Sequence, residues 1–255
     1  MPSKRRSPSA GSPRSKDEML YGINSVAGAM QARRRRLARL YLKAGRPSLR
    51  LSGLRTQAEE LGLTVTELSS GELEVLCGSP GHQGAVLACG ALPVLAEAEC
   101  LRLAGRGLPL LLVLDEVQDP QNFGAALRCC AVFGIDGMVL PRHHASPLSP
   151  AASKASAGYL ESFPVYSVAN LARFLGNCRK SGFWVAGTSA QGDTPLHTFT
   201  REQPLVVVMG NEARGLRPLV SRQCDFQIAI PTPGQGSLNV AAAAAVLLYQ
   251  LTLPR

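Results

Sequence analysis

The second half of the chain repeats one pattern, in which a short apolar run is followed by a stretch with helical periodicity. The runs are residues 110–114, 138–140, 183–186, 205–209 and 226–230. Strands that alternate with helices in this way predict a parallel sheet covered by helices on both faces. The alanine- and leucine-rich segment 237–251 follows the last run and is expected to form a largely buried closing helix. The sequence therefore predicts an α/β fold.

A smaller α/β unit is expected before this domain. Helical periodicity over 24–36 precedes an apolar alternation at 40–42, and a second helical stretch ends near 61–63, just before strand-like residues. The apolar run 84–89 closes the unit. We therefore expect a first domain over 18–92.

Composition places the other boundaries. Residues 1–17 are basic and have no hydrophobic period, which predicts a disordered arm. Residues 93–108, which contain Gly105 and Gly107, are expected to form a linker. The second domain is then expected over 109–255.

The excess of basic residues limits the class of partner. The chain has 27 Lys and Arg against 18 Asp and Glu, a net charge of +9. Such a charge favours a polyanion such as nucleic acid, through long-range attraction and counterion release. Much of the excess lies in two clusters, at 4–16 and 33–39. Charge alone does not separate RNA from DNA or an acidic membrane.

Cysteine and histidine positions argue against a metal site or a disulfide framework. The seven cysteines are odd in number and form no C-x-x-C pair, and the four histidines do not stand at ligand spacing. No stretch of about 20 apolar residues is present, which argues against a membrane partner. We expect a cytoplasmic protein. An organelle transit peptide is a weaker alternative for the Ser- and Arg-rich start, because Pro8 and Pro13 interrupt helical periodicity there.

Three polar loops follow three of the predicted strands. The first, residues 115–128, contains Asn122 and Arg128, which could also be a helix cap and a surface charge. The third, residues 230–241, ends on Ser237 and Asn239 where the last helix starts, and Ser237 could likewise be a cap. Ligands of open parallel sheets bind at the carboxyl ends of strands, so these loops are the expected site.

The second loop, residues 209–216, excludes one class of enzyme. It superficially matches G-x-x-x-x-G, but Leu216 and Arg217 stand where a phosphate-binding loop needs Lys and then Ser or Thr. ATP or GTP hydrolysis is therefore disfavoured. No G-x-G-x-x-G follows a predicted strand, so a dinucleotide site is not indicated either.

Taken in order, the three loops resemble the motifs of the SpoU (TrmH) superfamily of RNA 2′-O-ribose methyltransferases. The motifs are D-P-x-N-x-G-x-x-x-R at 119–128, G-x-E-x-x-G-L at 210–216, and I-P followed by S-L-N-V at 230–240. In the first domain, residues 21–26 and 82–84 resemble the ribosomal-protein-like substrate-binding domain of the bacterial 23S rRNA guanosine methyltransferase subgroup. Ala241 departs from the pattern, because many members have Ser after S-L-N-V.

The resemblance implies a fold, a cofactor and an assembly. The second domain should be a parallel sheet with a deep trefoil knot, a rare exception to unknotted topology. The cofactor should be S-adenosylmethionine, bound in the knot. The functional unit should be a homodimer joined through the catalytic domains, with each site completed by the partner.

Roles for individual residues also follow from the resemblance. Arg128 is the expected catalytic arginine, and because a guanidinium is a poor base we expect it to orient the ribose and its phosphate. The other expected catalytic residues are Asn122, Glu212, Ser237 and Asn239. Cofactor-binding residues are expected to be Thr188, Gly210, Asn211, Gly215, Ile230, Leu238 and Asn239. RNA-binding residues are expected to be Asn24, Arg33, Arg34, Arg35, Arg36, His82 and Gln83.

Alternatives to an rRNA ribose methyltransferase remain open at this stage. A tRNA ribose methyltransferase shares the motifs, but the separate first domain favours rRNA. A non-catalytic RNA-binding or ribosome-assembly protein shares the fold and charge, but has no reason to keep the polar set at the three loops. A DNA-binding protein fits the charge and none of the motifs.

Overall fold

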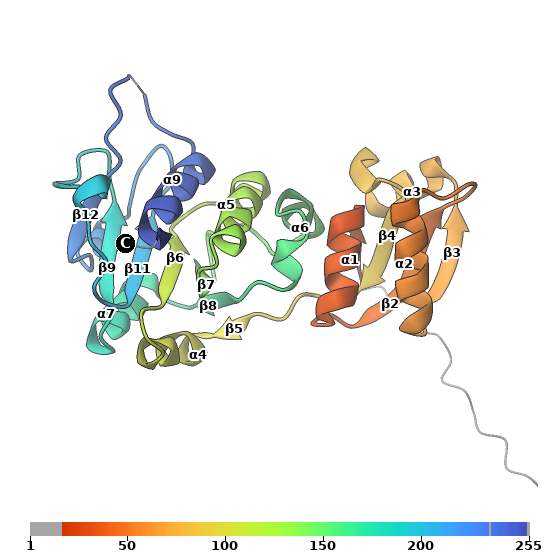
Figure 1. The fold of residues 1–255 in the computed structure, drawn as a ribbon, viewed down its shortest axis with the longest axis horizontal. Helices are drawn as coiled ribbons and strands as arrows, with labels where there is room; N and C mark the ends of the chain where they lie inside the picture. The colour runs from red at the N-terminus through yellow and green to blue at the C-terminus, as the bar shows by residue number, and fades with distance from the viewer. Residues whose placement is uncertain (1–16, 235, 254–255) are drawn as a thin grey trace, which may run out of the picture. The chain divides into compact units, whose positions relative to one another are not determined.

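The computed structural model describes residues 17–234 and 236–253, which divide between two compact units with the boundary between Pro93 and Val94 (Figure 1). All but the last residue of the predicted basic arm, 1–17, lies outside the described residues. No helix in the described part of the chain is long and apolar enough to cross a membrane.

The N-terminal unit is a four-stranded sheet with helices on its two faces. Its elements are β1 (Glu18–Tyr21), α1 (Ile23–Ala32), β2 (Leu37–Lys43), α2 (Leu49–Glu60), β3 (Thr64–Leu68), α3 (Ser70–Cys77), the 3-10 turn η1 (Pro80–His82) and β4 (Ala85–Cys89). The strand order is β1-β4-β2-β3, with β4 antiparallel to both neighbours and β2 parallel to β3. Helices α1 and α2 pack on one face around Met30, Leu40 and Leu54. Helix α3 covers the other face through Leu73.

The first helix is shorter than the predicted 24–36. It ends at Ala32, and Arg33 takes a left-handed backbone conformation with φ 52° while its N–H donates to Ala29 O. Beyond this turn Arg35 pairs with Glu18 on β1, with Nη1 2.5 Å from Oε2. The arginine run therefore leads into β2 and does not extend the helix.

The C-terminal unit is built on an eight-stranded sheet in which every pairing is parallel. Its strands are β5 (Leu95–Ala96), β6 (Leu110–Leu114), β7 (Gly137–Pro141), β8 (Val165–Val168), β9 (Trp184–Thr188), β10 (Thr194–Pro195), β11 (Leu205–Met209) and β12 (Phe226–Ala229). The order is β10-β12-β9-β11-β6-β7-β8-β5. The first strand, β5, lies at one edge; the chain then enters the centre at β6, adds β7 and β8 toward β5, and builds the other side with β9 to β12. This sheet confirms the predicted α/β class.

Helices cover both faces of this sheet. They are α4 (Glu97–Leu101), α5 (Pro120–Val132), α6 (Pro150–Ala155), α7 (Leu171–Lys180), α8 (Pro218–Ser221) and α9 (Val240–Thr252). On one face α7 packs through Phe174 onto Leu111 and Val113. On the other, α5 packs against α6 and α9 (Figure 1). The closing helix predicted at 237–251 corresponds to α9, whose exposed side is described below.

We expected a linker at 93–108, but residues 94–108 belong to the C-terminal unit. Strand β5 pairs with β8 at the edge of the sheet, and α4 and the 3-10 turn Arg102–Gly105 follow it. Cys100 and Leu103 point into the core beside α7. These buried side chains explain why the segment is ordered in spite of its glycines.

Helix α5 approaches α6 closely at Gly124. A Cβ added at Gly124 would lie 2.5 Å from Ala155 Cβ and 2.7 Å from Ala152 O. Overpacking of this kind costs about 1–3 kcal/mol. We therefore expect Gly124→Ala to lower the melting temperature in differential scanning calorimetry, by about 2–4 °C for each kcal/mol lost.

Gly176→Ala in α7 is the matched control. The only atom within 4 Å of an added Cβ there is Gln223 Oε1 at 3.3 Å, which lies at the end of a flexible side chain. Equal melting temperatures for the two variants would contradict the close helix contact.

Candidate active site

Polar side chains from three loops meet at the carboxyl edge of the C-terminal sheet. The loops are residues 115–119 after β6, 210–217 after β11, and 230–239 after β12, the last described except for residue 235. Because the strands are parallel, each loop starts at the same edge. The predicted motifs of the three loops are thereby brought together.

The Glu212 carboxylate joins the β11 loop to the first turn of α5 and to the start of α9. Its Oε1 accepts hydrogen bonds from Asn122 Nδ2 at 3.1 Å, Asn239 Nδ2 at 3.1 Å and the Val240 N–H at 3.0 Å. Asn239 Nδ2 also donates to Asn122 Oδ1 at 2.8 Å. The three side chains form a closed polar triangle, in which each orients the other two.

The helix caps next to this triangle are not Asn122 and Ser237, the caps that the sequence alone offered. The cap of α5 is Asp119, whose carboxylate accepts from the Gln121 and Asn122 N–H groups, both at 3.1 Å. The cap of α9 is Asn239, whose Oδ1 accepts from the Ala241 N–H at 2.8 Å. Asn122 and Ser237 are therefore not caps, and the side chain of Asn122 is available to the triangle.

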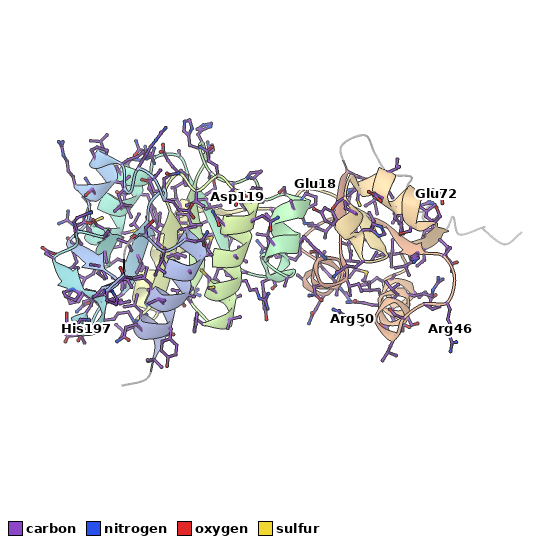
Figure 2. All side chains as sticks on the ribbon, turned by 90° about the horizontal axis from the view of Figure 1, so that it is seen from above. Glu18, Arg46, Arg50, Glu72, Asp119 and His197 are labelled. Carbon is purple, nitrogen blue, oxygen red and sulfur yellow. The ribbon has the colours of Figure 1, made fainter. Side chains whose placement is uncertain are left out.

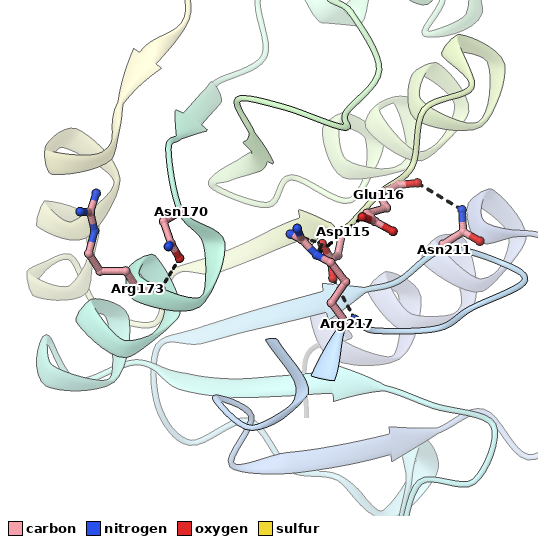
Figure 3. A network of polar contacts seen from close by, with 6 residues as sticks. All are labelled: Asp115, Glu116, Asn170, Arg173, Asn211 and Arg217. Carbon is pink, nitrogen blue, oxygen red and sulfur yellow. Dashed lines mark hydrogen bonds and ion pairs between the residues drawn. The ribbon is translucent and has the colours of Figure 1, made fainter. Parts of the chain in front are cut away.

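A buried ion pair holds the β6 and β11 loops together (Figure 3). Asp115 is 0% exposed, and its Oδ1 lies 2.8 Å from Arg217 Nε and 2.6 Å from Nη2. The Arg217 N–H also donates to Asp115 Oδ2 at 3.2 Å. The two residues thus fix the start of the β6 loop against the end of the β11 loop.

Asn211 closes the β11 loop on itself. Its backbone pairs with Gly215 in both directions, at 2.8 and 3.2 Å, and its Oδ1 accepts from the Ala213 N–H. Its Nδ2 donates to the Glu116 carbonyl at 3.2 Å, next to the ion pair in Figure 3. A Cβ on Gly210 would lie 2.3 Å from the carbonyl carbon of Gly215, so only glycine fits there.

Two cavities flank the Glu212 side chain. The first has a volume of about 530 Å³ and is enclosed by the ends of β9, β11 and β12, by the loops that follow them, and by α9. The second, of about 390 Å³, lies between the β6 and β11 loops and includes Asn122 and Asp119 in its wall. Glu212, Arg214 and Val240 line both cavities, so the two share a wall.

The first cavity collects most of the residues expected to bind the cofactor. Its wall includes Thr188, Gly210, Asn211, Gly215, Ile230 and Leu238, together with Glu212 and Ser237. Asn239 lines neither cavity but lies next to Val240, which lines both. No cluster of three His, Cys, Asp or Glu side chains suited to a metal occurs among the described residues.

Arg128 lies apart from this group. It is exposed on α5, lines neither cavity, and makes no side-chain hydrogen bond or ion pair within the described residues. Helical spacing puts it on the same face as Ala125 and Val132, and Val132 is 61% exposed. The expected catalytic arginine therefore lines neither of the two cavities of its own chain.

The arginine run expected to bind RNA is largely engaged within its own unit. Arg35 is 4% exposed and bonds to Glu18 and to the Gly90 carbonyl, so it is unsuited to contact RNA. Arg36 pairs with Asp17, and Arg34 donates to the Pro93 carbonyl. Arg34, Arg35 and Arg36 are thus engaged within the N-terminal unit, and the charge of this run cannot be counted in full as an RNA surface.

The other expected RNA-binding residues meet at one end of the N-terminal sheet. Gln83 Oε1 accepts from the Ile23 N–H at 3.2 Å, and Asn24 Oδ1 accepts from Arg50 Nη2 at 2.5 Å. His82 is buried beside them, and its Nδ1 accepts from the Gly84 N–H at 2.9 Å. The side chains of Asn24 and Gln83 are exposed.

Burial keeps the thiols of α5 and of the segment before β12 protonated. Burial raises the pKa of Cys129 and raises that of Cys130 much further, and both lie on α5. Burial also raises the pKa of Cys224 to about 11. These thiols stay protonated at neutral pH and are unsuited to act as nucleophiles.

Sequence reasoning missed the partnership of Asp115 and Arg217. The two residues are 102 positions apart, and each stands beside a recognised motif. One signal was available, because Asp115 directly follows a buried strand and a fully buried carboxylate needs a cationic partner. The sequence alone did not say which arginine supplies it.

Both units match known families over the same stretches that form these sites. The model of the SpoU rRNA Methylase family matches residues 109–249. The chain belongs to the SpoU rRNA methylase family. The model described as RNA 2′-O ribose methyltransferase substrate binding matches residues 19–94.

Individual relatives of this family resemble the chain over nearly its whole length. The 23S rRNA (guanosine-2′-O-)-methyltransferase RlmB of Coxiella burnetii is 36% identical over 94% of the chain and 97% of its own length. The enzyme of the same name from Acinetobacter baylyi is 37% identical over 92% and 96%. The SpoU methyltransferase AviRb from Streptomyces viridochromogenes, solved with the cofactor AdoMet, has a TM-score of 0.77 at 23% identity, over 94% and 90% of the two chains. This last likeness shows a shared fold.

The Asp115–Arg217 pair generates a stability prediction. Arg217→Gln leaves a buried carboxylate without its cation, which costs about 3–5 kcal/mol of unfolding free energy. Arg217 is 38% exposed, so we expect a loss near the lower end of that range in urea denaturation.

Arg179→Gln is the matched control for this prediction. It breaks the ion pair with Asp225, in which Arg179 is 49% exposed, and should cost at most about 1 kcal/mol. Similar losses of unfolding free energy in the two variants would show that the burial of Asp115 does not determine how much its ion pair contributes to stability.

Proposed function

We propose that the chain transfers a methyl group from S-adenosylmethionine to the ribose 2′-hydroxyl of a guanosine in 23S-type rRNA. One observation carries the proposal: Glu212 ties the three motif loops together on the wall shared by two adjacent cavities. The reaction needs this arrangement, because a methyl donor and a nucleotide must lie next to each other and be aligned. The names of the relatives supply the substrate.

The first cavity suits S-adenosylmethionine in its chemistry. Its wall combines apolar side chains, including Leu216, Ile230 and Leu247, with the polar groups of Asn211 and Gln227. Apolar walls suit an adenine ring, and amide groups suit the ribose and amino-acid ends of the molecule. When bound, the cofactor supplies a methyl group on a positively charged sulfur. The trefoil knot expected from the family would bring these loops into the same arrangement.

The chain's own residues position the reactants. Transfer is an in-line displacement, so the 2′-oxygen, methyl carbon and sulfur must be nearly collinear, and positioning supplies much of the rate. The triangle of Asn122, Glu212 and Asn239 fixes the wall between the cavities in one geometry. Ser237, which lines the first cavity, can donate or accept a hydrogen bond there. Arg128 holds the ribose and its phosphate, and the 2′-hydroxyl proton leaves to a group of the RNA or to solvent.

A second copy of the chain completes the site. The exposed side of α5 and α9 carries Val132 and Tyr249, which are 61% and 56% exposed, as well as Val246 and Leu253. Arg128 is exposed on that side and lines neither cavity of its own chain. A homodimer that buries this apolar surface would bring Arg128 of one copy to the cavities of the other.

The two alternatives make different use of these features. A non-catalytic RNA-binding protein has no need of the Glu212 triangle, which is intact. A tRNA methyltransferase needs the same triangle, but the match of residues 19–94 to a substrate-binding family and the near full-length match to enzymes named for 23S rRNA favour rRNA. An rRNA substrate in turn favours action in the cytoplasm.

Methyl transfer from radiolabelled S-adenosylmethionine tests the reaction. Wild-type protein should label 23S rRNA at an alkali-resistant site and leave bulk tRNA unlabelled. Arg128→Ala should lower kcat by roughly 100-fold or more, because alignment is lost. Arg179→Ala, outside both cavities, should retain normal turnover. Label in tRNA alone would overturn the substrate, and cofactor binding without transfer to rRNA, tRNA or assembly intermediates would favour the non-catalytic alternative.

Mixing two inactive variants tests the shared site. In a heterodimer of Arg128→Ala and Glu212→Ala, one site has both an intact arginine from one copy and an intact glutamate from the other. Equal mixing should therefore restore about a quarter of wild-type activity, since half the dimers are mixed and each has one good site of two. If Arg128 acts within its own chain, no mixed site is complete and no activity returns.

Solution mass tests the proposed surface itself. Val132→Asp places a charge in the apolar patch and should convert the dimer to a monomer in light scattering after gel filtration. Val75→Asp is the control, because Val75 is 86% exposed on α3 of the N-terminal unit. A Val132→Asp protein that stays dimeric would exclude this surface as the interface.

A further inference from the structure

The N-terminal unit contains a cavity of its own, which none of the comparisons assigns to a ligand. Its volume is about 570 Å³, and it lies where the loop after β2 meets the segment around η1. Its polar wall consists of Lys43, Arg46, Ser48, Ser70, His82 and Gln83. Two of these residues were expected from the sequence to bind RNA, and the other four were not.

The charge on this wall has one sign. Lys43 and Arg46 are exposed (Arg46 is labelled in Figure 2), and no Asp or Glu belongs to the wall. Neither cation has an ion pair or side-chain hydrogen bond within the described residues, whereas Arg35, Arg36 and Arg55 of the same unit are paired with carboxylates. The position of these two positive charges beside a cavity favours an anionic ligand.

A buried imidazole adds a directed donor to the cavity. His82 is 5% exposed, and its Nδ1 accepts a hydrogen bond from the Gly84 N–H at 2.9 Å, so the ring carries a proton on Nε2. The nearest partner of Nε2 is Ser70 Oγ at 3.5 Å, the outer limit of a hydrogen bond. Both groups line the cavity, and both can donate to a ligand oxygen there.

The start of α2 also favours an anion in this cavity. Ser48 and Leu51, at the first turn of this 12-residue helix, also line the cavity, and Ser48 caps the helix. The N-terminus of a helix carries partial positive charge and favours anions. Gly84, with φ +82°, lets the chain pass close to Lys43 and Leu51, where a Cβ would come within 3.1 Å of Leu51 Cδ1 and 3.2 Å of Lys43 Cβ. The fold thus brings the basic loop, the imidazole and the helix start together.

We propose that this cavity binds a backbone phosphate of the substrate RNA. Lys43 and Arg46 supply the charge, and His82 Nε2 and the Ser70 hydroxyl supply hydrogen bonds. A phosphodiester fits better than the carboxylate of a protein or peptide ligand. Several donors converge on one anion, and no group of the wall is arranged to recognise the rest of an amino-acid side chain. The proposal rests on the proposed function, since it takes the ligand to be the RNA that is methylated.

RNA affinity measured against salt tests the proposal. The probe is a 23S rRNA transcript, and the variants are Lys43→Gln, Arg46→Gln and the double variant. The double variant should weaken binding by roughly tenfold and reduce the slope of log affinity against log salt by about one, as expected for one lost phosphate contact. The KM for RNA should rise, while kcat at saturating RNA and the affinity for S-adenosylmethionine stay unchanged.

Arg55→Gln is the matched control in the same unit. It removes the same charge, but Arg55 is paired with Glu67 and does not line the cavity. Binding by the double variant that equals binding by Arg55→Gln would overturn the proposal even if wild-type protein methylates 23S rRNA. Absence of transfer by wild-type protein would instead count against the proposed function.

Two further measurements separate the source of the phosphate and the role of the imidazole. Calorimetric titration with inorganic phosphate should give no tight binding. A sub-millimolar site that is lost in the double variant, with RNA affinity unchanged, would assign the cavity to a free anion and overturn the RNA assignment. Ser70→Ala should weaken RNA binding without changing the melting temperature, and unchanged affinity there would remove the hydrogen-bonding part of the proposal.

Discussion

The parallel pairing of the C-terminal sheet is the constraint on which the candidate active site depends. Because every strand runs in the same direction, each loop that follows a strand begins at one edge. The order of strands then decides which loops become neighbours. Strand β11 lies between β6 and β9, so the loop after β11 lies beside the loop after β6, although four strands separate β6 from β11 in the sequence. The motifs are spread along the sequence because their strands are, and they meet because the sheet is parallel.

Two kinds of contact then hold the loops, and they differ in depth. The Asp115–Arg217 pair lies at the strand ends, where Asp115 is buried, and fixes the loops relative to the sheet. The Glu212 triangle lies further out, on the wall that both cavities share. The buried ion pair thus supports the loops from below, and the polar triangle orients the side chains above it. Such support matters because catalysis by positioning fails if the supporting side chains move.

Much of this arrangement could be predicted from the sequence, and the failures have physical causes. Alternation of apolar runs and helical segments predicted the sheet, and the ordered motifs predicted which loops meet. Local patterns could not show that α1 ends at Ala32, because Arg35 in the arginine run pairs with Glu18, a residue of β1 that lies before the helix. The same local patterns assigned 93–108 to a linker, since the presence of Gly105 and Gly107 does not reveal that Cys100 and Leu103 are buried. Contacts between distant residues override local preference in both cases.

The shared hydrogen bonds of Asn122, Glu212 and Asn239 have a consequence for how such a site evolves. Each side chain is held by the other two, so a replacement at one position changes the value of the residues at the others. Effects of single replacements should therefore not add, and a second loss within the triangle should cost little once the first has occurred. A substitution at one of these three positions is tolerated only if the other two residues change as well. The three residues should therefore be inherited as a set.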